Sequence, residues 1–140
     1  MAVHFFFADS TITLKQRNRL KQFIEEVFKK EGKRLSCLNY IFCSDKYLLN
    51  INRQYLNHDY YTDIITFDIS GKGEPVSGEI YISADRVKDN AAQLRTTISN
   101  EIHRVIFHGV LHLCGYKDKT RVQQKQMRLK ENQYLMKYFE

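Results

Sequence analysis

The chain has 140 residues, 43% of them hydrophobic, which suits one globular domain over residues 1–140 and is too short for two. It has no apolar run of about 18 residues, and its start, MAVHFFFADS, lacks the features of a secretory signal, so we expect a cytoplasmic protein without a membrane partner. Three cysteines without a CxxC pair exclude a zinc ribbon and argue against a disulfide framework.

The net charge of +6 is unevenly distributed along the chain. Seven basic and three acidic residues lie between Gly115 and Glu140. Two interpretations are open, a solvated helix face or a track for phosphate groups that would give sequence-independent affinity for a nucleic acid.

The first half of the chain predicts the order strand, helix, strand, helix. Val3–Phe7 is short, apolar and β-prone, which indicates a strand. Apolar residues at helical spacing then continue to Gly32, which is a typical helix stop. Leu35–Cys43 is largely apolar at both alternating sets of positions, as in a strand covered on both faces. Ser44 can cap the next helix, and the polar and aromatic residues 57–62 indicate a loop.

The second half predicts two strands followed by three helices. Residues 63–69 and 79–83 have strand patterns, whereas residues 70–78 contain Pro75 and three glycines, which indicates a loop. A short helix should follow over residues 84–94.

Two longer helices should complete the chain. Ser99 is placed to cap a helix with a strongly apolar side. Thr120 and Gln123 have the spacing of a capping box for a last helix that runs to about Tyr138. The resulting order, βαβαββααα, predicts an α+β fold in which a mixed four-stranded sheet packs with helices and the helix after Ser99 is central. The pattern does not predict the strand order.

The helix after Ser99 carries the string HGVLHLCGYKD at positions 108–118. His108 and His112 are four residues apart, so both imidazoles can face one metal ion. Gly115 can end the helix in a left-handed conformation and bring Asp118 toward the same face. Two histidines and one carboxylate would leave a coordination position open, as in a catalytic metal centre.

The spacing alone leaves alternatives open. A pair of histidines four residues apart is also compatible with plain helix surface, and Asp118 with an exposed loop residue. The zinc-protease motif HExxH has its general-base Glu directly after the first His, where this chain has Gly109. Because glycine cannot accept a proton, the residue types argue against that class of peptidase. Cys114 lies about 200° round the helix from His112, so we expect it in the core.

The string resembles HGxLHLxGYDH, the signature of the YbeY endoribonucleases. Seven positions match: His108, Gly109, Leu111, His112, Leu113, Gly115 and Tyr116. LNINRQYLNHDYYTDIITF at 49–67 resembles the family's LNxxYRxxDxxTDVLSF, and SGEIYIS at 77–83 resembles its GDIxIS. Two departures stand out, because Asp118 occupies the position of the family's third histidine and Leu56 that of an arginine.

The resemblance implies a YbeY-like metallohydrolase domain that acts as a metal-dependent, single-strand-specific endoribonuclease in ribosomal RNA maturation, with ribosomal RNA and the ribosome as partners. It implies one divalent metal bound by His108, His112 and Asp118, and zinc is the metal we expect. Because Asp118 lowers the formal charge of the site by one unit, Mn²⁺ or Fe²⁺ should become more competitive. The alternative is a non-catalytic ribosome-associated RNA-binding factor with a structural or vestigial metal site.

The remaining site assignments concern the missing arginine and the residues near the family motifs. In the family the arginine at the position of Leu56 is important for RNA cleavage, and Arg53, three residues earlier, is the candidate for the missing phosphate contact. The alternative is an ordinary exposed arginine.

Asp63 and Glu79 could hold the ligand imidazoles from behind, or could simply form turns. Four aromatic residues could stack bases, although we expect most of them in the core: Tyr55, Tyr60, Tyr61 and Phe67. No general base and no oligomeric state are predicted.

Overall fold

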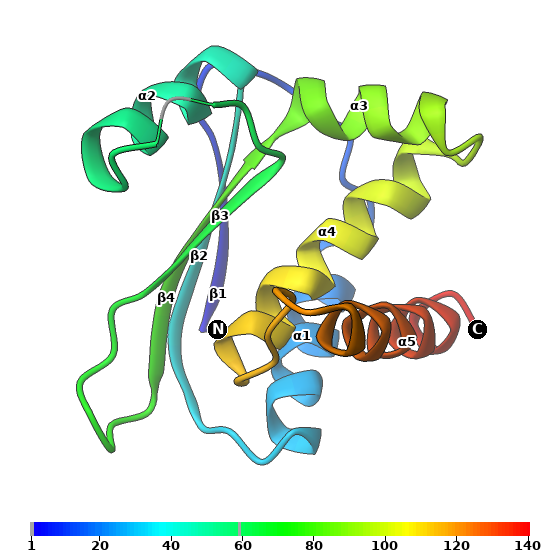
Figure 1. The fold of residues 1–140 in the computed structure, drawn as a ribbon. Coiled ribbons are helices and arrows are strands. Elements are labelled where there is room, and N and C mark those ends of the chain that lie inside the picture. Colours follow the sequence, from blue (N-terminus) through cyan, green and yellow to red (C-terminus); the bar gives the residue numbers. More distant parts are fainter. Residues whose placement is uncertain (1, 59) are drawn as a thin grey trace.

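The computed structural model describes residues 2–58 and 60–140, and its framework is a mixed four-stranded sheet (Figure 1). The strands are β1 (Val3–Phe7), β2 (Leu35–Cys43), β3 (Ile64–Asp68) and β4 (Val76–Ser83). Their order across the sheet is β1-β2-β4-β3. β2 lies parallel to both β1 and β4, whereas β3 lies antiparallel to β4.

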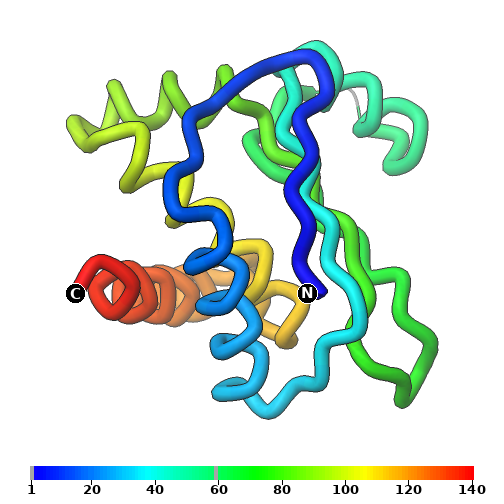
Figure 2. The backbone as a smooth tube through the Cα atoms, turned by 180° about the vertical axis from the view of Figure 1, so that it is seen from behind, coloured from blue at the N-terminus to red at the C-terminus, as the bar shows by residue number. Residues whose placement is uncertain are grey.

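Five helices in the described residues pack around this sheet. They are α1 (Arg17–Lys30), α2 (Asp45–Tyr55), α3 (Ala84–Gln93), α4 (Ile98–Leu113) and α5 (Arg121–Tyr138). Helices α1, α4 and α5 lie on one side of the sheet, as the ribbon and the backbone tube both show (Figures 1 and 2). Helix α4 contacts α1, α3, α5, β3 and β4, so the predicted α+β fold with a central α4 is confirmed.

The alternation of side chains on β2 divides the core into two parts. Leu38, Tyr40 and Phe42 are fully buried toward the large core that includes α1, α4 and α5. A smaller cluster of Cys43, Leu48 and Ile65 joins β2, α2 and β3. Both faces of β2 are therefore covered near its end, as its apolar pattern predicts.

Gly109 allows α4 to approach the sheet closely. A Cβ atom at this position would lie 2.7 Å from Cδ1 of Ile80 and 3.2 Å from Cδ1 of Ile64. The glycine at the position of a peptidase's general base therefore has a packing role.

The predicted boundaries are corrected at two places. Strand β4 begins at Val76, three residues earlier than predicted, because it continues its pairing with β2 as far as Leu35. The cap of α4 is Thr97, whose hydroxyl accepts from the Asn100 amide at 3.0 Å, so the assignment of Ser99 was wrong. The helix caps at Ser44 and Thr120 are confirmed.

The sequence also predicts a loop at 57–62 and no membrane partner. Position 59, inside the predicted loop 57–62, lies outside the described residues. Over 2–58 and 60–140, no helix has both the length and the apolar composition needed to cross a membrane.

Candidate metal centre

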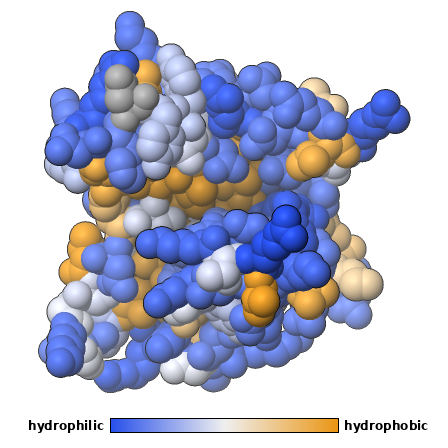
Figure 3. Space-filling view, in the orientation of Figure 1, coloured by the Kyte–Doolittle hydropathy of each residue, from blue (hydrophilic) through white to orange (hydrophobic). Residues whose placement is uncertain are grey.

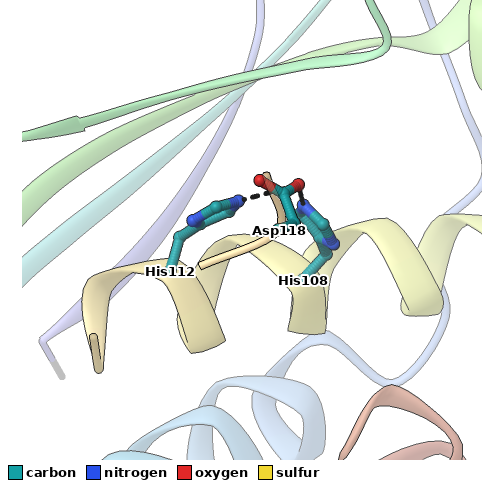
Figure 4. Close-up of side chains that lie close together, drawn as sticks. All are labelled: His108, His112 and Asp118. Atoms are coloured by element: carbon teal, nitrogen blue, oxygen red, sulfur yellow. Dashed lines mark ion pairs between the residues drawn. The ribbon is translucent and has the colours of Figure 1, made fainter. Parts of the chain in front are cut away.

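His108, His112 and Asp118 lie together above the last turns of α4 (Figure 4). The Oδ2 atom of Asp118 lies 3.3 Å from Nε2 of His108 and also 3.3 Å from Nε2 of His112. One potential ligand atom from each side chain fits within a span of 4.8 Å. All three side chains are partly exposed, so the group has the donors, the spacing and the access to bind a metal ion.

The turn that brings Asp118 to the histidines is a helix-terminating motif at Gly115. This residue has a φ of +104°, and its amide donates to the His112 carbonyl at 3.0 Å. The Tyr116 amide donates to the Leu111 carbonyl at 3.0 Å. These are the two hydrogen bonds of a Schellman motif, which reverses the chain after a helix. The predicted role of Gly115 is confirmed.

The loop after this turn is fastened at both ends. At one end, the Tyr116 hydroxyl donates to Oε1 of Glu31 at 2.7 Å. At the other, the side chain of Gln123 accepts from the amides of Lys119 and Thr120 in the capping box of α5. Asp118 therefore sits on a loop whose position is set by α1 and α5 together.

Glu31 is the acceptor at the centre of the first of these attachments. It also accepts from the Tyr134 hydroxyl and lies 3.5 Å from Nζ of Lys130. Burial acts to raise the pKa of Glu31, but the hydrogen bonds from Tyr134 and Tyr116 outweigh it and hold this pKa below its usual value.

Behind His108 lies a buried acid from the last helix. Oε2 of Glu131 is 2.6 Å from Nδ1 of His108, and Oε1 of Glu131 is 3.1 Å from Nη1 of Arg104. Burial acts to lower the pKa of His108, but the hydrogen bond and charge of Glu131 outweigh it and raise this pKa.

The three side chains line a cleft of about 730 Å³ between β3, α4 and α5. The face seen in Figure 3 is hollowed across its middle, with hydrophobic residues inside the hollow. Among the described residues that line the cleft, the guanidinium groups belong to Arg104 and Arg128. Asp63 is in the wall of the same cleft, where burial raises the pKa of its carboxyl group.

Other candidates from the sequence lie away from these three side chains. Arg53 is an exposed residue in the last turn of α2, outside the described lining of the cleft. Glu79 pairs with Phe67 and Asn39 within the sheet and is also outside that lining. Of the four aromatic residues that we expected mostly in the core, three are exposed instead: Tyr55, Tyr60 and Tyr61.

Glu131 was missed although the sequence contains a signal for it. It is the one acidic residue in α5, and it falls on the buried side of that helix with Met127, Tyr134 and Leu135. A lone carboxylate on an apolar helix face indicates a specific partner, because burying an unpaired charge is costly. The partners, His108 and Arg104, could not be named without the packing of α4 on α5.

The chain is similar to proteins that share one family description. The family model described as "Endoribonuclease YbeY" matches residues 6–139. A protein of that name from Cytophaga hutchinsonii is 51% identical over 130 residues, covering 93% of this chain and 91% of the relative. Another from Parabacteroides distasonis is 42% identical over 135 residues, covering 96% and 94%.

A solved structure supports the same relationship. The solution structure of a Thermotoga maritima protein superimposes with a TM-score of 0.67 at 28% identity, covering 98% of this chain and 89% of the other. With a family model that matches nearly the whole sequence, the chain belongs to the YbeY endoribonuclease family.

Proposed function

We propose that this protein is a metal-dependent endoribonuclease that cleaves single-stranded RNA during ribosomal RNA maturation. The observation that carries the proposal is the convergence of His108, His112 and Asp118 in an open cleft, in a chain of the YbeY family. The span 1–140 would act as one YbeY-like domain in the cytoplasm, with ribosomal RNA and the ribosome as partners.

The three side chains suit one divalent ion. Two imidazole nitrogens and a carboxylate oxygen are the donors of open zinc sites, and zinc is our first assignment. The negative charge of Asp118 favours Mn²⁺ or Fe²⁺ more than a third histidine would. When bound, such an ion supplies Lewis acidity toward a phosphoryl oxygen.

Arginine side chains in the same cleft suit an RNA backbone. Arg128 is about half exposed at the cleft and lies 3.7 Å from Glu131, so its guanidinium can turn toward a phosphate. Arg104 is more buried and is held by Glu131 and Asn132, which suits it to a fixed position in the wall. Arg128 is therefore a better-placed phosphate contact than Arg53.

Basic side chains continue along α5 beyond the cleft. Arg121, Lys125 and Arg128 are exposed on the helix that follows the Asp118 loop. Such a surface would align a phosphate backbone without reading its sequence. This role favours RNA over a peptide as the substrate.

An RNA cleavage assay with and without chelation tests the proposal. Purified protein should cleave a single-stranded ribosomal RNA fragment, lose this activity on chelation and regain it when Zn²⁺ or Mn²⁺ is restored. His108→Ala should remove the activity, since it deletes a ligand. Cleavage that survives both treatments, or wild-type protein inactive with every metal, would favour the alternative of a non-catalytic RNA-binding factor.

A further inference from the structure

We propose that Glu131 is a positioning residue for the metal centre, which fixes the tautomer and the ring orientation of His108. The inference rests on the metal site of the proposed function. It assigns to α5 a direct part in building a site whose ligands all come from α4 and the loop that follows it.

The contact between the two side chains determines where the imidazole proton lies. Nδ1 of His108 and Oε2 of Glu131 are 2.6 Å apart. Since an ionised carboxylate can only accept hydrogen bonds, the proton of this contact belongs to Nδ1. The lone pair of the neutral ring is then on Nε2, the atom that faces Asp118 at 3.3 Å. This is the nitrogen that a shared metal ion would need.

The second oxygen of Glu131 is engaged by a different donor. Oε1 accepts from Nη1 of Arg104 at 3.1 Å, and the Arg128 guanidinium lies 3.7 Å from the same oxygen. These positive groups offset the cost of burying a carboxylate that is only 4% exposed. Glu131 is thus held from two directions and can in turn hold the imidazole in one orientation.

This arrangement makes Glu131→Gln an informative substitution. A carboxylate presents two acceptors, one for His108 and one for Arg104, whereas an amide presents one acceptor and one donor group. The glutamine must therefore face one of these donors with its own NH₂ group. The size of the side chain is kept, so the substitution changes the charge and the hydrogen bonding of residue 131 and leaves its packing nearly unchanged.

A matched control is available on the facing helix. Glu101 is another buried carboxylate that lines the same cleft, and it lies 3.9 Å from Arg104. The ion pairs and hydrogen bonds found for His108 in the described residues do not include Glu101. Glu101→Gln therefore removes a buried charge near Arg104 and leaves the histidine's acceptor in place.

The first experiment measures Zn²⁺ affinity without RNA, by competition with a chromogenic chelator. Loss of the carboxylate behind a ligating histidine typically costs about 10- to 100-fold in metal affinity, and we expect a loss of this order for Glu131→Gln. Glu101→Gln should bind Zn²⁺ as the wild type does. Equal affinities for wild type and Glu131→Gln, or equal losses in the two variants, would overturn the inference.

The second experiment needs no substitution and so does not depend on the folding of a variant. Imidazole ¹⁵N chemical shifts of the Zn²⁺-loaded wild type should identify His108 as protonated on Nδ1 and ligated through Nε2. Ligation through Nδ1 would overturn the inference while leaving the metal site in place. A wild-type protein that binds no Zn²⁺ would instead overturn the proposed metal site and this inference together, so the two failures are distinguishable.

Discussion

The hydroxyl of Tyr116 donates a 2.7 Å hydrogen bond to Glu31 and thereby fastens the loop that carries Asp118 to the end of α1. Asp118 is two residues further along the chain and faces both histidines. The loop that carries this candidate ligand is therefore held by a contact between residues that are 85 positions apart in the sequence.

Tyr116→Phe should weaken metal binding without unfolding the protein. The substitution removes one hydrogen bond to a charged acceptor, which should cost about 1 to 3 kcal/mol of stability. Tyr134→Phe is the control, because Tyr134 donates to the same carboxylate from α5. We expect both variants to lose stability in urea titrations and only Tyr116→Phe to lose Zn²⁺ affinity. If both variants lost the same Zn²⁺ affinity, the result would contradict a specific role for the hydrogen bond of Tyr116.

Neutralising the basic surface of α5 should weaken RNA binding without regard to sequence. We choose Arg121→Gln with Lys125→Gln, two exposed residues of α5. Arg128 and Lys130 are left intact because they lie 3.7 Å from Glu131 and 3.5 Å from Glu31, which support the candidate site. Each lost phosphate contact should reduce the slope of log affinity against log salt by about 0.7 for single-stranded RNA.

The control for that experiment is Lys46→Gln with Lys72→Gln, which removes the same charge from exposed positions on α2 and the β3–β4 loop. Binding of two unrelated single-stranded RNAs should be measured over a range of salt concentrations. An unchanged salt slope in the α5 variant, or an equal decrease in the control, would indicate that the charge on α5 is only a solvated surface.

Gly109→Ala should destabilise the fold through overpacking. The new Cβ atom would lie 2.7 Å from Cδ1 of Ile80, a residue with no exposed surface. Forcing a methyl group into such a site typically costs about 1 to 3 kcal/mol. Gly71→Ala, in an exposed loop where the nearest atom is 3.3 Å away on Glu74, is the control. Denaturant midpoints should differ clearly between the two variants, and equal midpoints would contradict the packing role of Gly109.

The buried His103 should make the protein less stable in acid. Burial lowers the pKa of this histidine below 6.5, because the charged form is desolvated in the fold. As the pH falls below about 6.5, the unfolded chain binds the proton first, so the free energy of unfolding decreases. The nearby Arg19 acts in the same direction.

His103→Phe tests this effect, because it keeps a ring against Tyr138 and Phe139 and removes the titration. Urea titrations of chelator-treated protein should be made at neutral pH and at a pH below the pKa of His103. The free energy of unfolding should decrease more in the wild type than in the variant between these two conditions. Parallel pH profiles for the two proteins would contradict the assignment of acid sensitivity to His103.

Local patterns were sufficient for most of the fold and for the three clustered side chains. Periodicity, caps and glycines gave the element order, and the spacing of His108 and His112 with the turn at Gly115 gave the cluster. Interactions between distant segments could not be predicted. The strand order, the attachment of Tyr116 to Glu31 and the contact of Glu131 with His108 all depend on tertiary packing that no local pattern contains.

X-ray absorption spectroscopy of the protein loaded with one equivalent of Zn²⁺ tests the metal centre most directly. We predict a first shell of nitrogen and oxygen atoms at about 2.0 to 2.2 Å, with outer scattering from two imidazoles. Asp118→Ala should remove an oxygen ligand, and His108→Ala should remove one of the imidazoles. A shell that contains sulfur at about 2.3 Å would contradict ligation by His108, His112 and Asp118. A shell that stays as in the wild type in both variants would contradict it as well.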